Sequence, residues 1–316
     1  MDMNAKYIRA VMKSKTSLAY YTDLGGMFLG KSDQLLSGKF FKAIEGKVSL
    51  IFTSPPFPLN RKKRYGNETG DTYIEWLCEF GQFFKKMLTQ DGSIVIEMGN
   101  SWEPGSPVMS TLSTRALLEF QSKNSLYLCQ EFIWQNPAKL PTPVQWVNVE
   151  RIRVKDSFTK LWWMSPTANP KASNKRVLKE YSDSMKILLK NRRYNSGKRP
   201  SEHHISESAF LRNNGGAIPS SVLTYPNTNS SDPYQLYCRE KGFQLHPARM
   251  PSELASFFIK FLTEPGDIVF DPFGGSNTTG ASSEALERYW ISIEASEEYI
   301  KGSKGRFGGK IVKDFL

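Results

Sequence analysis

Short apolar runs and segments of helical periodicity alternate along the first half of the chain. Apolar runs typical of buried strands lie at 48–52, 93–98, 126–134 and 158–164. Apolar and aromatic residues recur at helical spacing from Tyr73 to Leu88, after a capping Asp71, and a turn is predicted at Asp91-Gly92. A second helix is predicted between residues 109 and 121. The alternation predicts an α/β fold with a mostly parallel sheet, and the aromatic stripe of the first helix is expected in the core.

The end of the chain repeats this pattern, whereas the middle departs from it. A helix is predicted at 252–262, directly after Pro251, and strands are predicted at 267–271 and 289–293. Residues 166–240 are instead rich in Pro, Gly, Asn and Ser and show weak periodicity. We interpret them as an inserted region, since the alternative, a long disordered loop, would be unusually large for a compact domain. The predicted divisions are therefore 1–165, 166–240 and 241–316.

The pentapeptide Thr53-Ser54-Pro55-Pro56-Phe57 directly follows the first predicted strand. The ends of such strands are where α/β enzymes bind ligands. Two prolines hold the chain extended and remove two backbone donors, so the carbonyl groups near Ser54 and Pro55 can act as acceptors. Phe57 adds an apolar face. The motif predicts a slot for a flat ring that carries an exocyclic amino group, and the alternative is an ordinary strand-ending turn.

A second motif follows the strand at 267–271. Residues 272–280 form a glycine-rich turn that opens a helix, which lets backbone approach a ligand closely. The next apolar run ends in Glu294, about 20 residues beyond the glycines, where an acid binds ribose hydroxyls in nucleotide-binding folds. The spacing is neither G-x-G-x-x-G nor a P-loop, which disfavours a dinucleotide or a triphosphate. We therefore predict a nucleoside-cofactor site, with a tight turn capped by Ser276 as the structural alternative.

Together the two motifs resemble those of the DNA amino-methyltransferases. Their order along the chain is similar to that of the permuted beta group, and Ser54 before the prolines resembles the cytosine-N4 branch and its PvuII-type modification methylases. The similarity extends through residues 61–63, 136–141, 151–156, 161–163 and 246–249. Asn277 stands where the family commonly has Gly, but Asn tolerates a left-handed backbone.

This resemblance implies a Rossmann-like fold, dependent on S-adenosyl-L-methionine, in which residues 166–240 are the target-recognition region. It implies that the target base is held by Ser54, Pro55, Pro56 and Phe57. It implies that the cofactor is held by Thr53, Pro251, Asp271, Phe273, Gly274, Gly275, Ser276, Asn277, Thr278 and Glu294.

Charge points to a polyanionic partner. The formal net charge is +11, and residues 151–215 hold 15 Lys and Arg against 5 Asp and Glu, so the basicity is regional. The cluster Arg61, Lys62, Lys63 and Arg64 follows the pocket motif and is suited to phosphate contact around an extruded nucleotide, with screened surface charge as the alternative. Net charge alone does not separate DNA from RNA or a membrane surface, and the family resemblance implies double-stranded DNA as the partner.

The expected activity is transfer of a methyl group to cytosine N4, in the modification half of a restriction-modification system. A cognate endonuclease is expected, not necessarily in contact, and the chain is expected to be a monomer or a homodimer. No Pro-Cys motif supplies the thiolate that carbon-5 methylation requires. Adenine-N6 methylation is the alternative, and an inert DNA-binding module and RNA or protein methylation are rivals.

The remaining composition bounds the cellular setting. The three cysteines have no metal-ligand spacing, so no metal is expected. Residues 1–29 hold no apolar stretch of signal-peptide or transmembrane length. We therefore expect a cytoplasmic, nucleoid-associated protein of bacterial type with no membrane partner.

Overall fold

The computed structural model describes residues 3–13, 17–38, 42–57, 70–192, 194, 196–206 and 210–316. The chain divides into a larger unit, Met1–Ala172 with Ser221–Leu316, and a smaller unit, Ser173–Ser220. The basic cluster Arg61, Lys62, Lys63 and Arg64 lies outside the described residues.

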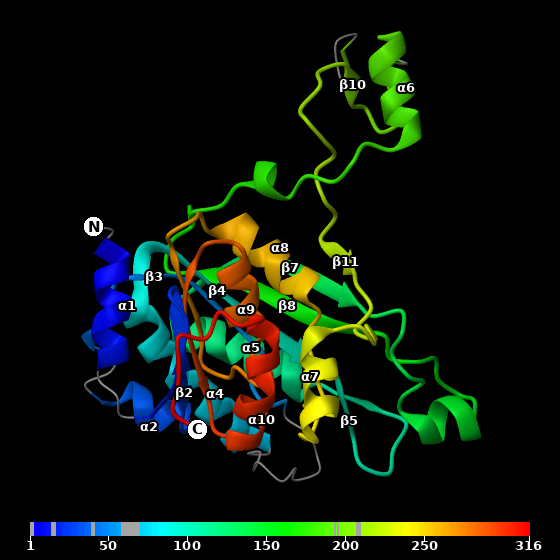
Figure 1. Cartoon of the computed structure of the whole chain (residues 1–316). Coiled ribbons are helices and arrows are strands. Elements are labelled where there is room, and N and C mark those ends of the chain that lie inside the picture. The colour runs from blue at the N-terminus through cyan, green and yellow to red at the C-terminus, as the bar shows by residue number, and fades with distance from the viewer. Residues whose placement is uncertain are drawn as a thin grey trace. The chain divides into compact units, whose positions relative to one another are not determined.

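The larger unit is built on one sheet, in which ten strands pair among the described residues (Figure 1). In spatial order they are β11 (Val222–Thr224), β7 (Tyr127–Gln135), β8 (Phe158–Ser165), β4 (Leu88–Gly99), β3 (Val48–Thr53), β12 (Ile268–Asp271), β13 (Tyr289–Glu294), β2 (Gly25–Leu29), β1 (Leu18–Tyr21) and β14 (Lys313–Asp314). β8 and β1 pair antiparallel with both of their neighbours, and the other pairs are parallel. The predicted α/β fold with a mostly parallel sheet is confirmed.

Helices cover both faces of this sheet (Figure 1). The described helices of the larger unit are α1 (Met3–Lys13), α2 (Ser32–Leu36), α4 (Gly70–Met87), α5 (Leu112–Lys123), α7 (Pro233–Lys241), α8 (Ser252–Leu262), α9 (Thr278–Ala285) and α10 (Glu297–Ser303), with a π-helix at Gln145–Val149 and a 3₁₀ helix at Lys304–Phe307. Successive strand residues point to opposite faces. Ile51 accordingly joins the core beneath α1, α4 and α5, while the ring of Phe52 packs 5.3 Å from that of Phe258 in α8. The sheet is therefore buried on both sides, which explains its near-continuous apolar strands.

Several element boundaries differ from those that the sequence predicts. The predicted turn at Asp91-Gly92 is wrong, because β4 begins at Leu88 and includes both residues. Val48 of β3 pairs with Leu88 of β4, and Leu50 pairs with Ser93. The pairing of the two strands is therefore irregular at residues 89–92. The helix predicted from residue 109 begins at Leu112, after the short hairpin of β5 (Ser101–Trp102) and β6 (Met109–Ser110).

The described residues of the smaller unit form little core of their own. Its elements are a 3₁₀ helix (Asn174–Val177), α6 (Asp183–Asn191) and the hairpin of β9 (Gly197–Lys198) and β10 (His204–Ile205). No residue of α6 is buried. The predicted interval 166–240 extends beyond this unit at both ends, because residues 166–172 and 221–240, with β11 and α7, belong to the larger unit.

Candidate active site

The two sequence motifs meet because β3 and β12 are parallel neighbours in the sheet. Their carboxyl ends therefore lie at the same edge, where α/β folds place their ligands. Thr53 Oγ1, at the end of β3, donates a hydrogen bond of 2.8 Å to Asp271 Oδ1, at the end of β12. A cavity of about 650 Å³ opens at this point and is lined by residues of both motifs. Its volume suits a small molecule of cofactor size.

Ser54 lies in the cavity wall beside a buried carboxylate. Its hydroxyl donates a hydrogen bond to Glu97, which lies on the adjacent strand β4 and is 4% exposed. Burial raises the pKa of Glu97, and the hydrogen bond from Ser54 opposes that rise. Glu97 was not among the predicted site residues. A lone acid inside the apolar run 93–98 was the signal that could have identified it.

Phe57 forms another part of this wall, against Gly99 at the end of β4. A Cβ atom on Gly99 would lie 2.5 Å from Phe57 Cε2. Glycine is therefore required at position 99 for the ring to keep its place. The aromatic residues Tyr73, Trp76 and Phe80 of α4 also line the cavity. The aromatic stripe of α4 is thus part of the core, as predicted, and in addition forms a wall of the site.

The glycine-rich loop after β12 depends on Asn277. Its backbone is left-handed, with φ of 56°, and its Oδ1 caps α9 by accepting from Gly280 N at 3.2 Å. Ser292 Oγ donates to the same oxygen at 2.7 Å, and Asn277 Nδ2 donates to the Tyr20 hydroxyl at 2.9 Å. The expected tolerance of Asn for this turn is confirmed. The cap is therefore Asn277 and not Ser276, and the fully buried Asn277 side chain lies beneath the loop, outside the cavity wall.

Asp271 organises the start of this loop. Besides the bond from Thr53, it accepts hydrogen bonds from Thr279 Oγ1 at 2.7 Å and Phe273 N at 3.1 Å. Burial raises the pKa of its carboxyl to about 6, and the bonds from Thr279 and Thr53 oppose the rise. The carboxylate therefore fixes the backbone of the loop from below.

Glu294 lies across the loop, at the end of β13. Its carboxylate accepts from Gly275 N and from Ser296 N, both at 2.8 Å. Burial raises its pKa, and these backbone bonds oppose the rise. A Cβ atom on Gly275, whose φ is 51°, would lie 3.1 Å from His246 Nε2, so a larger residue would be strained and crowded there. Glu294 thus faces the cavity beside an open backbone, as a ribose contact requires.

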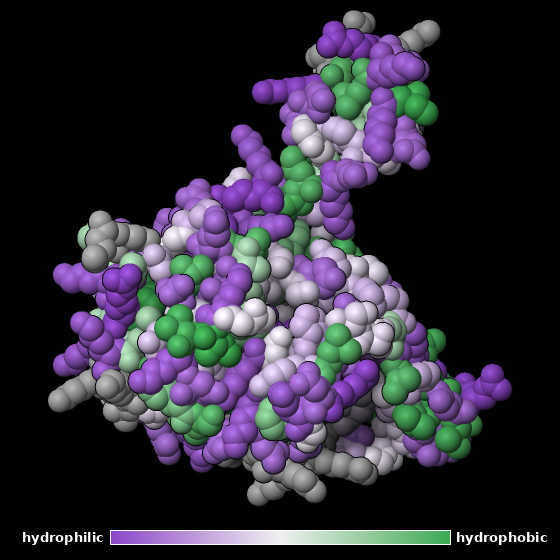
Figure 2. All heavy atoms as spheres, in the orientation of Figure 1, coloured by the Kyte–Doolittle hydropathy of each residue, from purple (hydrophilic) through white to green (hydrophobic). Residues whose placement is uncertain are grey.

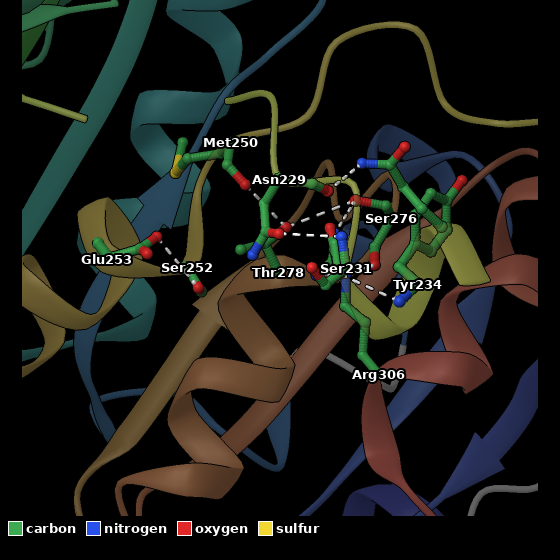
Figure 3. Close-up of polar contacts among 11 residues, drawn as sticks. Asn229, Ser231, Tyr234, Met250, Ser252, Glu253, Ser276, Thr278 and Arg306 are labelled. Atoms are coloured by element: carbon green, nitrogen blue, oxygen red, sulfur yellow. Dashed lines mark hydrogen bonds and ion pairs between the residues drawn. The ribbon is translucent and has the colours of Figure 1, made fainter. Parts of the chain in front are cut away.

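Ser276 is clamped from outside the loop by Arg306, which the sequence analysis did not identify (Figure 3). Arg306 Nε donates to Ser276 O at 2.7 Å, and its Nη2 donates to Ser276 Oγ at 3.1 Å. Asp232 forms an ion pair with Arg306 at 3.2 Å. On the other side, Thr278 Oγ1 donates to Met250 O at 3.3 Å (Figure 3). The loop is therefore held on both sides before any ligand binds.

Most of the predicted site residues are gathered in one cavity wall. They are Ser54, Pro55, Pro56, Phe57, Asp271, Phe273, Gly274, Gly275, Ser276, Thr278 and Glu294. Thr53, Pro251 and Asn277 lie outside the wall, and Met250 lines it in place of Pro251. Asn136, Lys139 and the segment 246–249 line it as well.

Features of metal-binding and membrane-spanning proteins are absent from the described residues. No group of His, Cys, Asp and Glu in this part of the chain could hold a metal ion. No described helix is long and apolar enough to cross a membrane.

An open α/β sheet that joins a glycine-rich nucleoside loop to an S-P-P-F tetrapeptide defines a methyltransferase. A family model described as DNA methylase matches residues 48–305, and the chain belongs to this family. It is 42% identical over 291 residues to the Type II methyltransferase M.PvuII of Proteus hauseri. The aligned region covers 92% of this chain and 85% of that protein.

One solved structure gives the same assignment, and a second shares the fold. The chain matches the PvuII DNA methyltransferase (cytosine-N4-specific) with a TM-score of 0.74 at 37% identity, covering 92% of this chain and 89% of that one. It also matches the complex of M1.HpyAVI with SAM, with a TM-score of 0.51 at 19% identity. This match covers 89% of this chain and 98% of that one. The second match supports the fold alone.

Proposed function

We propose that this chain transfers a methyl group from S-adenosyl-L-methionine to the N4 amine of cytosine in double-stranded DNA. The observation that carries the proposal is the position of Ser54. Its hydroxyl lies in the cavity wall, bonded to buried Glu97, while the adjoining Thr53 is bonded to the start of the glycine-rich loop. A target amine and a nucleoside cofactor would therefore meet in one cavity. The similarity to M.PvuII supports cytosine as the base.

The cofactor half of the cavity fits a nucleoside with a charged tail. Glu294 offers carboxylate oxygens for ribose hydroxyls, and Gly274 and Gly275 leave room for close approach of backbone. Phe273 supplies an apolar side, and its ring packs 5.2 Å from that of Phe80. When bound, S-adenosyl-L-methionine supplies an electrophilic methyl group on a sulfonium.

Ser54 and Pro55 would act on the target amine. The lone pair of cytosine N4 is delocalised into the ring, so the enzyme must localise it and aim it at the methyl group. Because Ser54 gives its own proton to Glu97, its oxygen lone pairs remain to accept an amine hydrogen. The Pro55 carbonyl would accept the second hydrogen, and Phe57 would pack on the face of the flipped ring.

Glu97 would take the proton that methyl transfer releases. As the N–CH₃ bond forms and the bond between the methyl carbon and the sulfonium sulfur breaks, an N4 proton would pass to Ser54 Oγ while the Ser54 proton would pass to a Glu97 oxygen. Burial raises the pKa of Glu97, which makes it a better proton acceptor than an ordinary surface carboxylate. No covalent bond between enzyme and base is needed.

We place this activity in a restriction-modification system, with a cognate endonuclease that need not contact this chain. The relative M.PvuII is named a Type II methyltransferase, which supports this setting. The smaller unit, Ser173–Ser220, shares residues 173–215 with the basic stretch 151–215 and would read the target sequence. Arg61, Lys62, Lys63 and Arg64 would bind phosphates near the extruded base. The cell compartment that follows is the cytoplasm, at the nucleoid.

The direct test is the identity of the methylated nucleoside. DNA treated with the protein and cofactor would be digested to nucleosides and analysed by mass spectrometry against synthetic standards. We expect N4-methylcytosine, and its absence after treatment with Ser54→Ala protein. N6-methyladenine or 5-methylcytosine as the product would contradict the proposal.

A further inference from the structure

The connection between β7 and β8 is far longer than an ordinary hairpin loop. Gln135 and Phe158 are the last paired residues of the two strands, and Asn136 N donates to Ser157 O at 2.8 Å. Residues 137–156, the β7–β8 projection, therefore leave and rejoin the sheet at adjacent points. Hairpin loops usually hold about two to five residues, and much longer loops are commonly functional. Figure 1 shows the projection in green beyond the sheet, at the lower right.

Both ends of the projection lie in the wall of the candidate active site. Asn136 and Lys139 line the cavity where the projection begins, and Ser157 and Phe158 line it where the projection ends. Lys139 Nζ and Asp156 Oδ2 are joined by an ion pair of 3.1 Å, which ties the two ends together. The projection therefore starts and ends beside the cavity to which the proposed function assigns the target base.

The projection exposes apolar side chains that the core does not use. They are Leu140 (77% exposed), Val144 (56%), Val149 (63%), Ile152 (53%) and Val154 (86%). Single exposed apolar residues are normal, but a group on one short segment marks an interaction surface. Figure 2 shows hydrophobic surface beside hydrophilic surface on this part of the molecule.

Three exposed cations alternate with two of these residues, in the order Arg151, Ile152, Arg153, Val154, Lys155. Within the described part of the chain, none of the three is ion-paired. Arg153 Nε donates to Pro107 O at 3.0 Å and Lys155 Nζ to Pro137 O at 3.2 Å, and these acceptors are carbonyl oxygens. The charges of Arg153 and Lys155 are therefore positioned but not neutralised.

We propose that the β7–β8 projection contacts the DNA duplex next to the extruded base, with Arg151 and Lys155 on phosphates and Ile152 and Val154 against the base step that the target leaves. The inference rests on the proposed function. Extrusion exposes apolar base faces flanked by phosphates, and proteins that open base steps combine cations with apolar wedges. A second copy of the chain is a poorer occupant, because a symmetric contact would bring like charges together.

The apolar part is tested with the double variant Ile152→Ala/Val154→Ala. Val312→Ala is the control, because Val312 is an exposed apolar residue that lies just before β14, at the opposite edge of the sheet. Single-turnover methylation is measured on a matched duplex and on one with a mismatch at the target cytosine. We expect the double variant to be slower on matched DNA by roughly tenfold or more, and the deficit to shrink on mismatched DNA, where extrusion costs less. Ile152→Thr/Val154→Thr, which keeps the branched Cβ at both positions but adds a hydroxyl, should show the same pattern.

The basic part is tested with Arg151→Gln/Lys155→Gln, and with Lys310→Gln as the exposed control. Log affinity for DNA decreases linearly as log salt concentration rises, and each phosphate contact contributes about 1 to the steepness of that decrease. The steepness should be smaller by about 2 for the double variant and unchanged for the control. Cofactor affinity is measured for every variant to confirm folding.

The outcomes separate this inference from the proposed function. If the unmodified protein fails to methylate DNA, the proposed function fails. If it methylates DNA while both double variants behave as their controls do, the projection does not contact the duplex and the inference is overturned. Sedimentation that changes from dimer to monomer in the variants, with unchanged DNA parameters, would also overturn it and assign the surface to a second copy.

Discussion

Thr53 Oγ1 donates a 2.8 Å hydrogen bond to Asp271 Oδ1 across 218 residues of sequence. The bond joins β3, which leads into the S-P-P-F motif, to β12, which leads into the glycine-rich loop. Since Thr279 and Phe273 bond the same carboxylate, one buried side chain fixes the relative position of both motifs. Geometry in either half of the site therefore depends on the other half.

The buried Asp271 makes the stability of the ligand-free protein depend on pH. Its pKa is raised from 3.8 to about 6, so the folded state holds its proton more tightly than the unfolded state does. The stabilising contribution is complete below pH 4 and is lost as pH rises through about 6. We expect the unfolding free energy of the protein, relative to Asp271→Asn, to fall by about 3 kcal/mol over this interval. Urea denaturation from pH 4 to 7 measures it, and a difference that is flat or rises with pH would disagree.

Glu294→Ala should weaken cofactor binding. Loss of a charge-assisted contact to ribose hydroxyls costs about 1.5–3 kcal/mol, which is roughly 10- to 150-fold in affinity. Isothermal titration calorimetry measures the change. Glu298→Ala, at an exposed position on α10, is the matched control and should bind as the parent does. Equal affinities for the two variants would remove Glu294 from the cofactor site.

Gly99→Ala should slow methyl transfer while cofactor affinity stays close to that of the parent. The added Cβ would meet the Phe57 ring at 2.5 Å and displace it from the target-base half of the cavity. Misplacement by about 1 Å can cost on the order of 100-fold in rate. Single-turnover kinetics with saturating cofactor measure the effect. A second substitution, Phe57→Leu, should relieve the clash, and a full parental rate in Gly99→Ala alone would show that the ring position is unimportant.

Exchange of Ser173–Ser220 for the corresponding segment of a relative should change the methylated sequence. Methylation mapping of cellular DNA reads both the base and its context. The base should remain cytosine, because the cavity lies wholly in the larger unit. An active exchanged protein that keeps the parental target sequence would place specificity elsewhere.

The sequence predicted the parts of the site that follow from local rules. Strand-end motifs located Ser54 and Glu294, since a parallel strand delivers its next residues to a known edge of the sheet. The Asn277 turn followed from backbone preference. Glu97 could not be placed in the same way, because its contact with Ser54 depends on the pairing and register of β3 with β4.

Other features depend on pairings that no local pattern encodes. β8 runs antiparallel to β7 because the two strands form a hairpin. The connection between them is too long to be recognised in the sequence as a hairpin turn. Tyr20 meets Asn277 across 257 residues, through a strand at the far side of the sheet that was not predicted. Arg306 reaches Ser276 only because the chain returns to the loop after α10.

If Ser54 and Glu97 act together on the amine, methyl transfer depends on the protonation state of Glu97, and the pH profile of the rate is the decisive measurement. Single-turnover rates would be measured with saturating cofactor and DNA for the parent protein and for Glu97→Gln. Burial raises the pKa of Glu97 above its ordinary value of 4.5. We therefore predict that the parental rate rises with pH as Glu97 loses its proton, and that this rise occurs at a pH above 4.5. The Glu97→Gln rate should be lower and lack that limb, with cofactor affinity unchanged. A parental rate and pH profile in Glu97→Gln would contradict the account.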